Sequence, residues 1–302
     1  MSSFFSRIET FFKNKSIFTN LIAINIIVFL LLRLFDVIAT LFKFNPEILL
    51  NFMKLPADFA QIITLPWTLI TYMFAHYDFL HILFNMLWLY WFGKIFLLFF
   101  NPRQLSGLYI LGGLAGALFF ILSYNYFPYF EDKISNSTLI GASASVMAIV
   151  FGVAFYRKNF EIPLLLFGRV KIIYLALFTL VLDMLSITSS NAGGHIAHIG
   201  GALLGICFAH FYLKGKDITS PLNLSIDKVF NLFKKKPKKR MKVNFQKNKN
   251  TVGSSKQADY DYNAKRNQDN TEIDRILEKI KKSGYNCLTE DEKKRLFDAS
   301  NK

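Results

Sequence analysis

The sequence predicts an all-α protein that crosses a membrane several times. Of its 302 residues, 52% are hydrophobic and 33 are Phe, and the mean hydropathy is above zero. This composition is too apolar for a soluble domain of that length. Helices are expected because they satisfy their own backbone hydrogen bonds in hydrocarbon. Six apolar segments each approach the roughly 20 residues that a membrane-crossing helix needs: 17–35, 79–100, 104–124, 139–156, 170–188 and 194–213.

The distribution of cations predicts how this bundle, expected over 17–213, lies in the membrane. The preceding segment, 1–16, carries Arg7, Lys13 and Lys15. No small-residue cleavage site follows the first span, which therefore reads as a retained helix and not as a removed signal peptide. Further cations flank the second and fourth interhelical turns: Lys94, Arg103, Arg157, Lys158, Arg169 and Lys171. This positive-inside pattern predicts cytoplasmic termini, and the richness in Lys, Asn and Phe is typical of a bacterial plasma membrane protein from an AT-rich genome.

The connection at 36–78 is too long and too apolar for a free tether. We interpret it as short amphipathic helices that lie in the outer membrane interface.

A polar cytoplasmic tail follows Leu213. It carries 23 Lys or Arg against 12 Asp or Glu, which is +11 of the formal charge of +15. We interpret 214–270 as a basic juxtamembrane and disordered linker, whose run at 226–242 suits anionic lipid. Nucleic acid is the rival partner for such a run but is not expected so close to the last span. A small helical hairpin is predicted at 271–302, with a capping box formed by Thr289 and Glu292.

Several polar side chains fall inside the apolar segments, where such groups are costly and are usually functional. His81 and Asn85 are four residues apart and share one helix face. His195 and His198 are three residues apart on the last span. Ser143 opens the fourth span, and Ser145 points about 200° away from it. We expect Ser145 to bond back to a carbonyl of the preceding turn, that of residue 140 or 141.

Three readings of these side chains compete. The side chains can form hydrogen bonds that hold the helices together, as is common in membranes. A metal site is disfavoured, since no HExxH motif is present and only Asp78 and Asp183 offer a carboxylate. A serine nucleophile needs a nearby base and donors that face the developing oxyanion. Ser143, an imidazole of the last span and the face shared by His81 and Asn85 supply all three.

Small residues predict that two of the helices pack closely. Ala144, Ala148 and Gly152 recur every four residues on the fourth span, and Gly201 and Gly205 do so on the sixth. Such smooth faces let backbones approach each other in a membrane. Their contact would bring the hydroxyl and imidazole groups together at the outer end of the bundle.

Four spaced motifs resemble those of the rhomboid family of intramembrane serine proteases. They are Gly141-Ala142-Ser143-Ala144, His81 with Asn85, the segment from Ala197 and His198 to Gly201, and Pro66-Trp67-Thr68. The resemblance covers about residues 15–213. Its departures from the family pattern are Ala144, Met147 and Thr68.

The resemblance implies a six-helix rhomboid-like bundle with a Ser143–His198 dyad, in which His81, Asn85 and the Ser143 N–H hold the oxyanion. It implies no metal or other cofactor. Substrates would be transmembrane segments of other membrane proteins. Met147 would pack against His198, and His195 would either support the site or cap its helix. The alternative is a catalytically inactive rhomboid-like protein that binds membrane clients.

Overall fold

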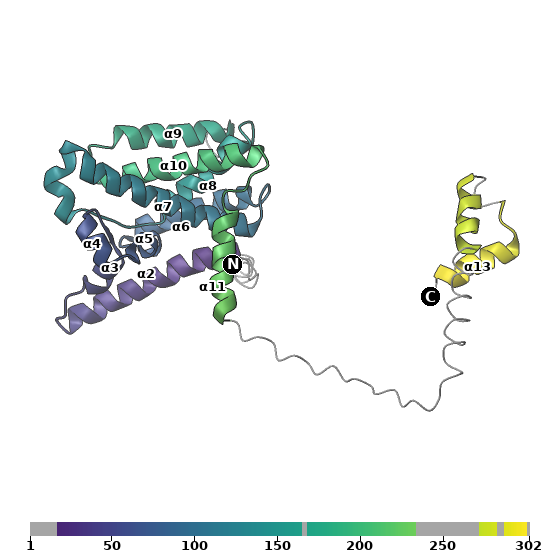
Figure 1. The fold of residues 1–302 in the computed structure, drawn as a ribbon, viewed down its shortest axis with the longest axis horizontal. Helices are drawn as coiled ribbons and strands as arrows, with labels where there is room; N and C mark the ends of the chain where they lie inside the picture. Colours follow the sequence, from purple (N-terminus) through teal and green to yellow (C-terminus); the bar gives the residue numbers. More distant parts are fainter. Residues whose placement is uncertain (1–16, 165–167, 234–271, 283–286, 301–302) are drawn as a thin grey trace, which may run out of the picture. The chain divides into compact units, whose positions relative to one another are not determined.

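A computed structural model describes residues 17–164, 168–233, 272–282 and 287–300 (Figure 1). The chain forms two compact units, Met1–Lys234 and Lys235–Lys302. The described elements of the first unit are α2 (Ile17–Leu41), α3 (Ile48–Met53), β1 (Leu55–Pro56), α4 (Phe59–Thr64), α5 (Thr68–Thr71), η1 (Tyr72–Phe74), α6 (Phe79–Phe96), α7 (Pro102–Tyr126), η2 (Pro128–Asn136), β2 (Thr138–Leu139), α8 (Ser143–Tyr156), β3 (Glu161–Leu164), β4 (Gly168–Lys171), α9 (Ile172–Leu185), α10 (Ala192–Leu213) and α11 (Ser220–Phe233).

Four described helices, α2, α6, α7 and α10, are long and apolar enough to cross a membrane. The helices α8 and α9 are also apolar but have only 14 residues each. The chain is therefore an all-α, polytopic integral membrane protein. Three of the six expected spans, 79–100, 139–156 and 170–188, were predicted too long, and 17–35 was predicted too short.

The two shorter helices begin late because extended backbone precedes each of them. Thr138–Leu139 pairs with β1 in a two-stranded antiparallel sheet, and Gly141 has a φ of +112°, which a right-handed helix cannot contain. Gly168–Lys171 forms a hairpin with β3. Hydropathy alone cannot tell such extended apolar residues from helical ones.

The helix α8 is the most buried element of the bundle and packs against α7, α10 and α6 (Figure 1). Every residue from Ala144 to Ala154 is buried. An element with no exposed face must meet close neighbours on all sides, and small residues make this possible.

Glycines of the two neighbouring helices face the small residues of α8. A Cβ added at Gly116 of α7 would lie 2.5 Å from the Cβ of Ala144. A Cβ added at Gly201 of α10 would lie 2.1 Å from the carbonyl oxygen of Ala144, and one at Gly205 would lie 2.4 Å from that of Ala148. These contacts leave no room for a methyl group, so the helix spacing depends on the glycines.

The connection between the first two long helices contains short helices, as predicted. The helix α2 continues to Leu41, and α3, α4, α5 and η1 then follow in quick succession. Trp67 of the Pro-Trp-Thr motif donates its indole N–H to the carbonyl of Phe52 over 2.9 Å. Its indole ring also packs against the phenyl ring of Phe52. The motif therefore joins the start of α5 to α3.

Part of the segment predicted as a juxtamembrane linker, 214–270, forms the helix α11 (Ser220–Phe233). The amphipathic helix α11 packs on the start of α7, where Arg103 and Asp227 form an ion pair of 3.1 Å. Gln104 donates to the carboxylate of Asp217 over 2.9 Å. These side-chain pairs join residues more than 100 positions apart, so the tail composition alone did not reveal them. The predicted disordered part at 243–270 and most of the basic run lie outside the described residues.

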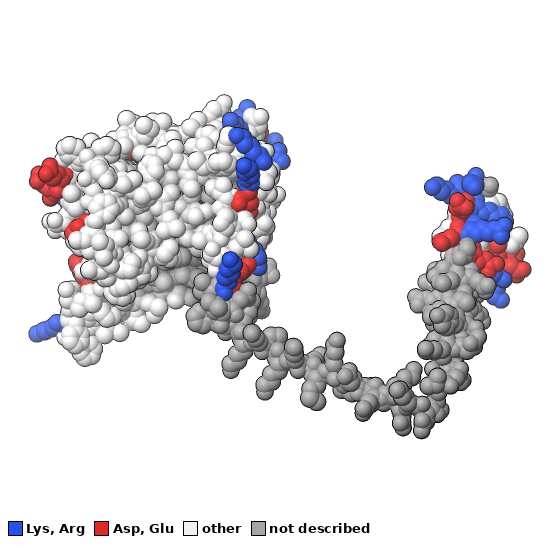
Figure 2. All heavy atoms as spheres, in the orientation of Figure 1, with Lys and Arg blue, Asp and Glu red and all other residues white. Residues whose placement is uncertain are grey.

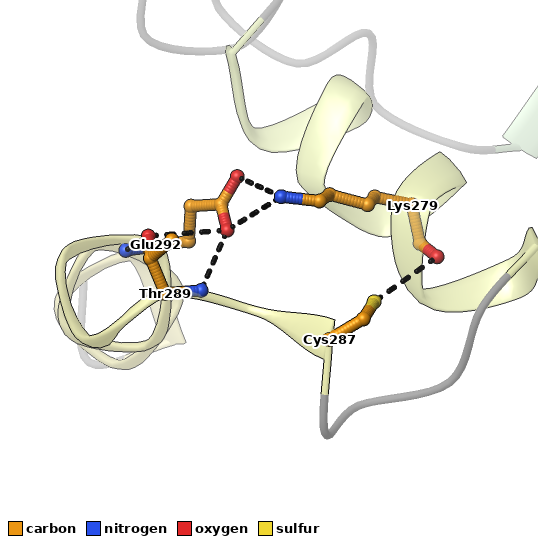
Figure 3. Close-up of polar contacts among 4 residues, drawn as sticks. All are labelled: Lys279, Cys287, Thr289 and Glu292. Atoms are coloured by element: carbon orange, nitrogen blue, oxygen red, sulfur yellow. Dashed lines mark hydrogen bonds and ion pairs between the residues drawn. The ribbon is translucent and has the colours of Figure 1, made fainter.

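The second unit contains a helix at 272–282 and α13 (Glu290–Ser300). The predicted capping box is confirmed, because the Thr289 N–H donates to Glu292 Oε2 over 2.8 Å (Figure 3). Glu292 also forms an ion pair of 2.9 Å with Lys279 of the first helix, and Figure 3 shows the Cys287 thiol directed at the Lys279 carbonyl. Both links hold the two helices together.

Candidate active site

Ser143 is the first residue of α8, and the two residues before it are held by Tyr72 of η1 and by His76, which lies between η1 and α6. The Gly141 N–H donates to the carbonyl of Tyr72 over 2.9 Å. The Ala142 N–H donates to Nε2 of His76 over 3.3 Å. The position of Ser143 is therefore fixed from outside its own helix, and its N–H lies in the first turn, where no helical carbonyl can accept it.

The imidazole of His81, on α6, lies directly against the backbone before Ser143. A Cβ added at Gly141 would lie 2.7 Å and 2.8 Å from two atoms of this ring. A glycine is thus required twice over at position 141, by its positive φ and by the ring of His81. Asn85 lies one turn further along α6 and donates to the carbonyl of His81 over 2.9 Å.

His76, which was not among the predicted site residues, is a buried neighbour of the site. Its side chain is fully buried, and its ring meets that of His81 edge to face at 5.1 Å. Its Nε2 accepts the Ala142 N–H, whereas its Nδ1 has no hydrogen-bond partner in the described structure. Burial, with a smaller contribution from His81, lowers the pKa of His76 to about 3, so the ring is neutral and can act as an acceptor.

The two histidines of α10 meet a single carboxylate oxygen of α9. Nδ1 of His198 and Nδ1 of His195 each lie 2.8 Å from Oδ1 of Asp183. Asp183 is buried. The side chain of His195 therefore lies beside Asp183 and does not cap α10, whose N-cap position is Asn191. The signal that could have identified Asp183 is its position as an acid inside an apolar helix, where such a group needs a partner.

One cavity brings the predicted site residues together. It has a volume of about 800 Å³ and lies between α6, α8, α9 and α10. Its lining includes Ser143, His81, Asn85, Met147, His195, His198 and Asp183. A serine hydroxyl, three imidazoles and the carboxylate of Asp183 therefore share one space large enough for an extended peptide segment and water.

Ser145 lies on the other side of α8, away from this cavity. Its hydroxyl lies 4.0 Å from the sulfur of Met73 and is fully buried. The expected bond to a carbonyl of the preceding turn is not formed, because the hydroxyl points toward the Met73 sulfur and packs against Gly113 of α7 instead. Two serines on one helix are thus placed in different environments.

Only one group of described residues has donor atoms arranged to hold a metal. The nitrogen and oxygen atoms of Asp183, His195 and His198 all lie within 4.8 Å of one another.

Comparisons with known proteins agree with the motif pattern. The rhomboid domain model matches residues 64–215, half of the chain, and a family of unknown function, DUF6576, matches residues 256–302. The chain is 32% identical over 168 residues to RHOMBOID-like protein 12, mitochondrial, of Arabidopsis thaliana. This match covers 53% of the chain and 50% of the plant protein, so the chain aligns with only about half of that relative. The chain belongs to the rhomboid family.

Proposed function

We propose that this protein is an intramembrane serine endopeptidase that hydrolyses peptide bonds in or near transmembrane segments of other membrane proteins. Ser143 is the nucleophile and His198 is the general base. Asp183 holds the imidazole of His198 in the orientation and tautomer that the reaction needs.

The observation that carries this proposal is the contact of 2.8 Å between His198 Nδ1 and Asp183 Oδ1. A carboxylate accepts and never donates when it is ionised, so the imidazole proton resides on Nδ1. The lone pair of Nε2 is then free to accept a proton. Ser143 lines the same cavity, which makes its hydroxyl the proton donor in this scheme.

The reaction proceeds in two steps that balance. Ser143 Oγ attacks the peptide carbonyl carbon while its proton moves to His198 Nε2. The C–N bond then breaks and the proton passes to the leaving amine, which leaves an ester on Ser143. Water attacks this ester by the same path and restores the serine hydroxyl, so no oxidant or cofactor is needed.

The negative charge that develops on the carbonyl oxygen requires donors already in place. The Ser143 N–H is one, because it begins α8. His81 and Asn85 line the cavity from α6, and His81 lies against the backbone of Gly141. In the proposed mechanism these three groups share the oxyanion.

The proposed orientation follows from the distribution of charge. Figure 2 shows Lys and Arg gathered at the end of the bundle where α10 ends, with acidic side chains beside them, whereas the opposite end carries acidic side chains and fewer basic ones. The cations at the ends of α6, α8 and α10 and at the starts of α7 and α9 meet there, among them Lys94, Arg103, Arg157, Lys171 and Lys214. We propose that this end faces the cytoplasm of a bacterial-type plasma membrane. Ser143, at the other end of α8, then opens to the outer side.

The proposed partners are therefore single transmembrane helices that enter from the lipid. A protease must bind an extended segment, so helices with Gly or Pro near the scissile bond are favoured, since they unwind most easily. Anionic lipid is the proposed partner of the basic tail.

The test is cleavage of single-span reporter proteins in liposomes, each with a Gly-Pro pair in the outer third of its transmembrane helix. Ser143→Ala should abolish cleavage, whereas Ser145→Ala should retain it, because Ser145 does not line the cavity. Cut sites are mapped by mass spectrometry. Equal cleavage by Ser143→Ala would refute the assignment of the nucleophile. Absence of cleavage by a folded wild-type protein that also fails to react with serine probes would favour a client-binding rhomboid-like protein.

A further inference from the structure

His195, His198 and Asp183 form a cluster whose geometry exceeds what serine catalysis needs. A catalytic imidazole requires one orienting acceptor, yet two Nδ1 atoms meet the same oxygen of Asp183, each at 2.8 Å. The two rings are nearly perpendicular, with an interplanar angle of 81° and centroids 5.8 Å apart. Their edges, and not their faces, therefore converge on one point beside Asp183.

Two imidazole nitrogens and one carboxylate oxygen are a common donor set for Zn²⁺. All three donor atoms lie within 4.8 Å of one another. Tetrahedral zinc, with bonds of about 2.0–2.1 Å, holds its donors about 3.3 Å apart. Each Nδ1 atom, now 2.8 Å from Asp183 Oδ1, would therefore have to move outward by roughly half an ångström for zinc to bind between them, with water as the fourth ligand.

The cluster is also accessible and anionic. All three residues line the large cavity, and the side chains of His195 and His198 are 23% and 20% exposed. Among the described residues that line this cavity there is no Lys or Arg, whereas Asp78 is a second carboxylate. A divalent cation can thus reach a site where no resident cation competes for Asp183.

We propose that these three residues form an inhibitory zinc site. Zinc bound to Nδ1 of a neutral imidazole requires the ring proton to be on Nε2. His198 Nε2 then carries a hydrogen and cannot accept the proton of Ser143. The metal also takes the carboxylate oxygen of Asp183, so the zinc-bound and catalytic arrangements exclude each other. The inhibition, though not the metal binding, rests on the proposed protease function.

The test separates metal binding from catalysis. Full-length Ser143→Ala protein in detergent is titrated with Co²⁺, whose visible absorption reports tetrahedral coordination by nitrogen and oxygen. One equivalent should saturate the signal, and Zn²⁺ should abolish it by displacement, whereas Mg²⁺ should leave it unchanged. Adding His195→Ala should weaken Co²⁺ binding at least tenfold, since even the loss of a residue that only hydrogen-bonds to a metal ligand lowers metal affinity about 10- to 100-fold. His210→Ala is the matched control, because His210 belongs to the same helix but does not line the cavity.

Inhibition is then measured as the rate of fluorophosphonate labelling with and without Zn²⁺, each variant being normalised to its own metal-free rate. Saturating zinc should slow labelling of the wild type and of His210→Ala by about 100-fold or more, because it removes the general base, but should have little effect on His195→Ala. Failure to bind one equivalent of Co²⁺ would overturn the metal site. Equal zinc inhibition of His195→Ala would overturn its ligand set. Saturable Co²⁺ binding by a protein that is never labelled would leave the metal site standing and refute the protease function.

Discussion

Replacement of Asp183 by Asn removes the charge that orients His198 in the proposed mechanism, while it preserves the shape of the side chain. In the wild type, Asp183 Oδ1 accepts from Nδ1 of both His198 and His195. An Asn side chain offers one carbonyl oxygen and one NH₂ group in the same space. If the NH₂ group faces the rings, each ring must present a lone pair at Nδ1, and His198 then carries its proton on Nε2.

The size of the effect follows from the bond that is lost. A hydrogen bond to a charged group contributes roughly 1.5–3 kcal/mol, and each 1.36 kcal/mol changes a rate about tenfold. Loss of this contact from the transition state should therefore lower kcat about 10- to 150-fold. Complete reversal of the tautomer would raise the loss toward about 10⁴-fold, as in the serine protease triad.

The assay is the rate of reporter cleavage in liposomes, with kcat and KM determined separately. Asp183→Asn should lower kcat and leave KM within about twofold, because an interaction made only in the transition state does not affect binding. Ser186→Ala is the control, since Ser186 lines the same cavity from the end of α9. A kcat within about threefold of the wild type would refute the role of Asp183, because even the weakest bond considered predicts about tenfold.

Three further predictions concern stability and local order. Gly201→Ala should destabilise the bundle by about 1–3 kcal/mol or more, because its methyl would lie 2.1 Å from the Ala144 carbonyl oxygen. Thermal unfolding in detergent tests this, with Leu203→Ala at an exposed position of the same helix as the control. A melting temperature equal to that of the wild type would contradict the prediction. The pKa of His76 is lowered to about 3 in the folded protein, so this ring binds a proton more readily in the unfolded chain. The free energy of unfolding should therefore fall by roughly 2–3 kcal/mol from pH 7 to pH 4.5. His76→Gln should reduce this pH dependence, and an unchanged pH dependence would refute the prediction. Thr289→Ala should cost α13 about 1 kcal/mol, measured in the full chain as faster hydrogen exchange at its first turn, and unaltered exchange would contradict the capping box.

Much of the fold was predictable because the membrane restricts the choices. Long apolar runs such as Ile17–Leu41 and Pro102–Tyr126 can only be helices in hydrocarbon. The lengths of α8 and α9 were not predictable from hydropathy, since apolar residues such as Leu139 are equally suited to a strand. The starts of these helices depend on strand pairing and on one positive φ at Gly141. Neither feature changes the average hydropathy of the segment.

The grouping of candidate residues followed from helical spacing, although their roles stay predictions. His81 and Asn85, or His195 and His198, share a face by periodicity alone. The contact of Asp183 with both imidazoles depends on how α9 lies against α10, and a sequence does not state that geometry. Even so, a lone acid in the apolar α9 was a signal that it needed a partner.

His76 was harder to identify for a physical reason. Its contact with the Ala142 N–H joins residues 66 positions apart, and it lies in an irregular segment before α6 where no period applies. Residues of this kind, which fix the backbone next to a reacting atom, become visible only when the packed structure is known.

The most direct test of the central claim is whether Ser143 is an activated serine. Purified full-length protein is treated with a fluorophosphonate probe, and the labelled peptide is identified by mass spectrometry in the wild type, Ser143→Ala, His198→Ala and Ser145→Ala. We expect labelling at Ser143 in the wild type and in Ser145→Ala, and none in the other two variants. Labelling of another residue, or undiminished labelling of His198→Ala, would contradict this expectation.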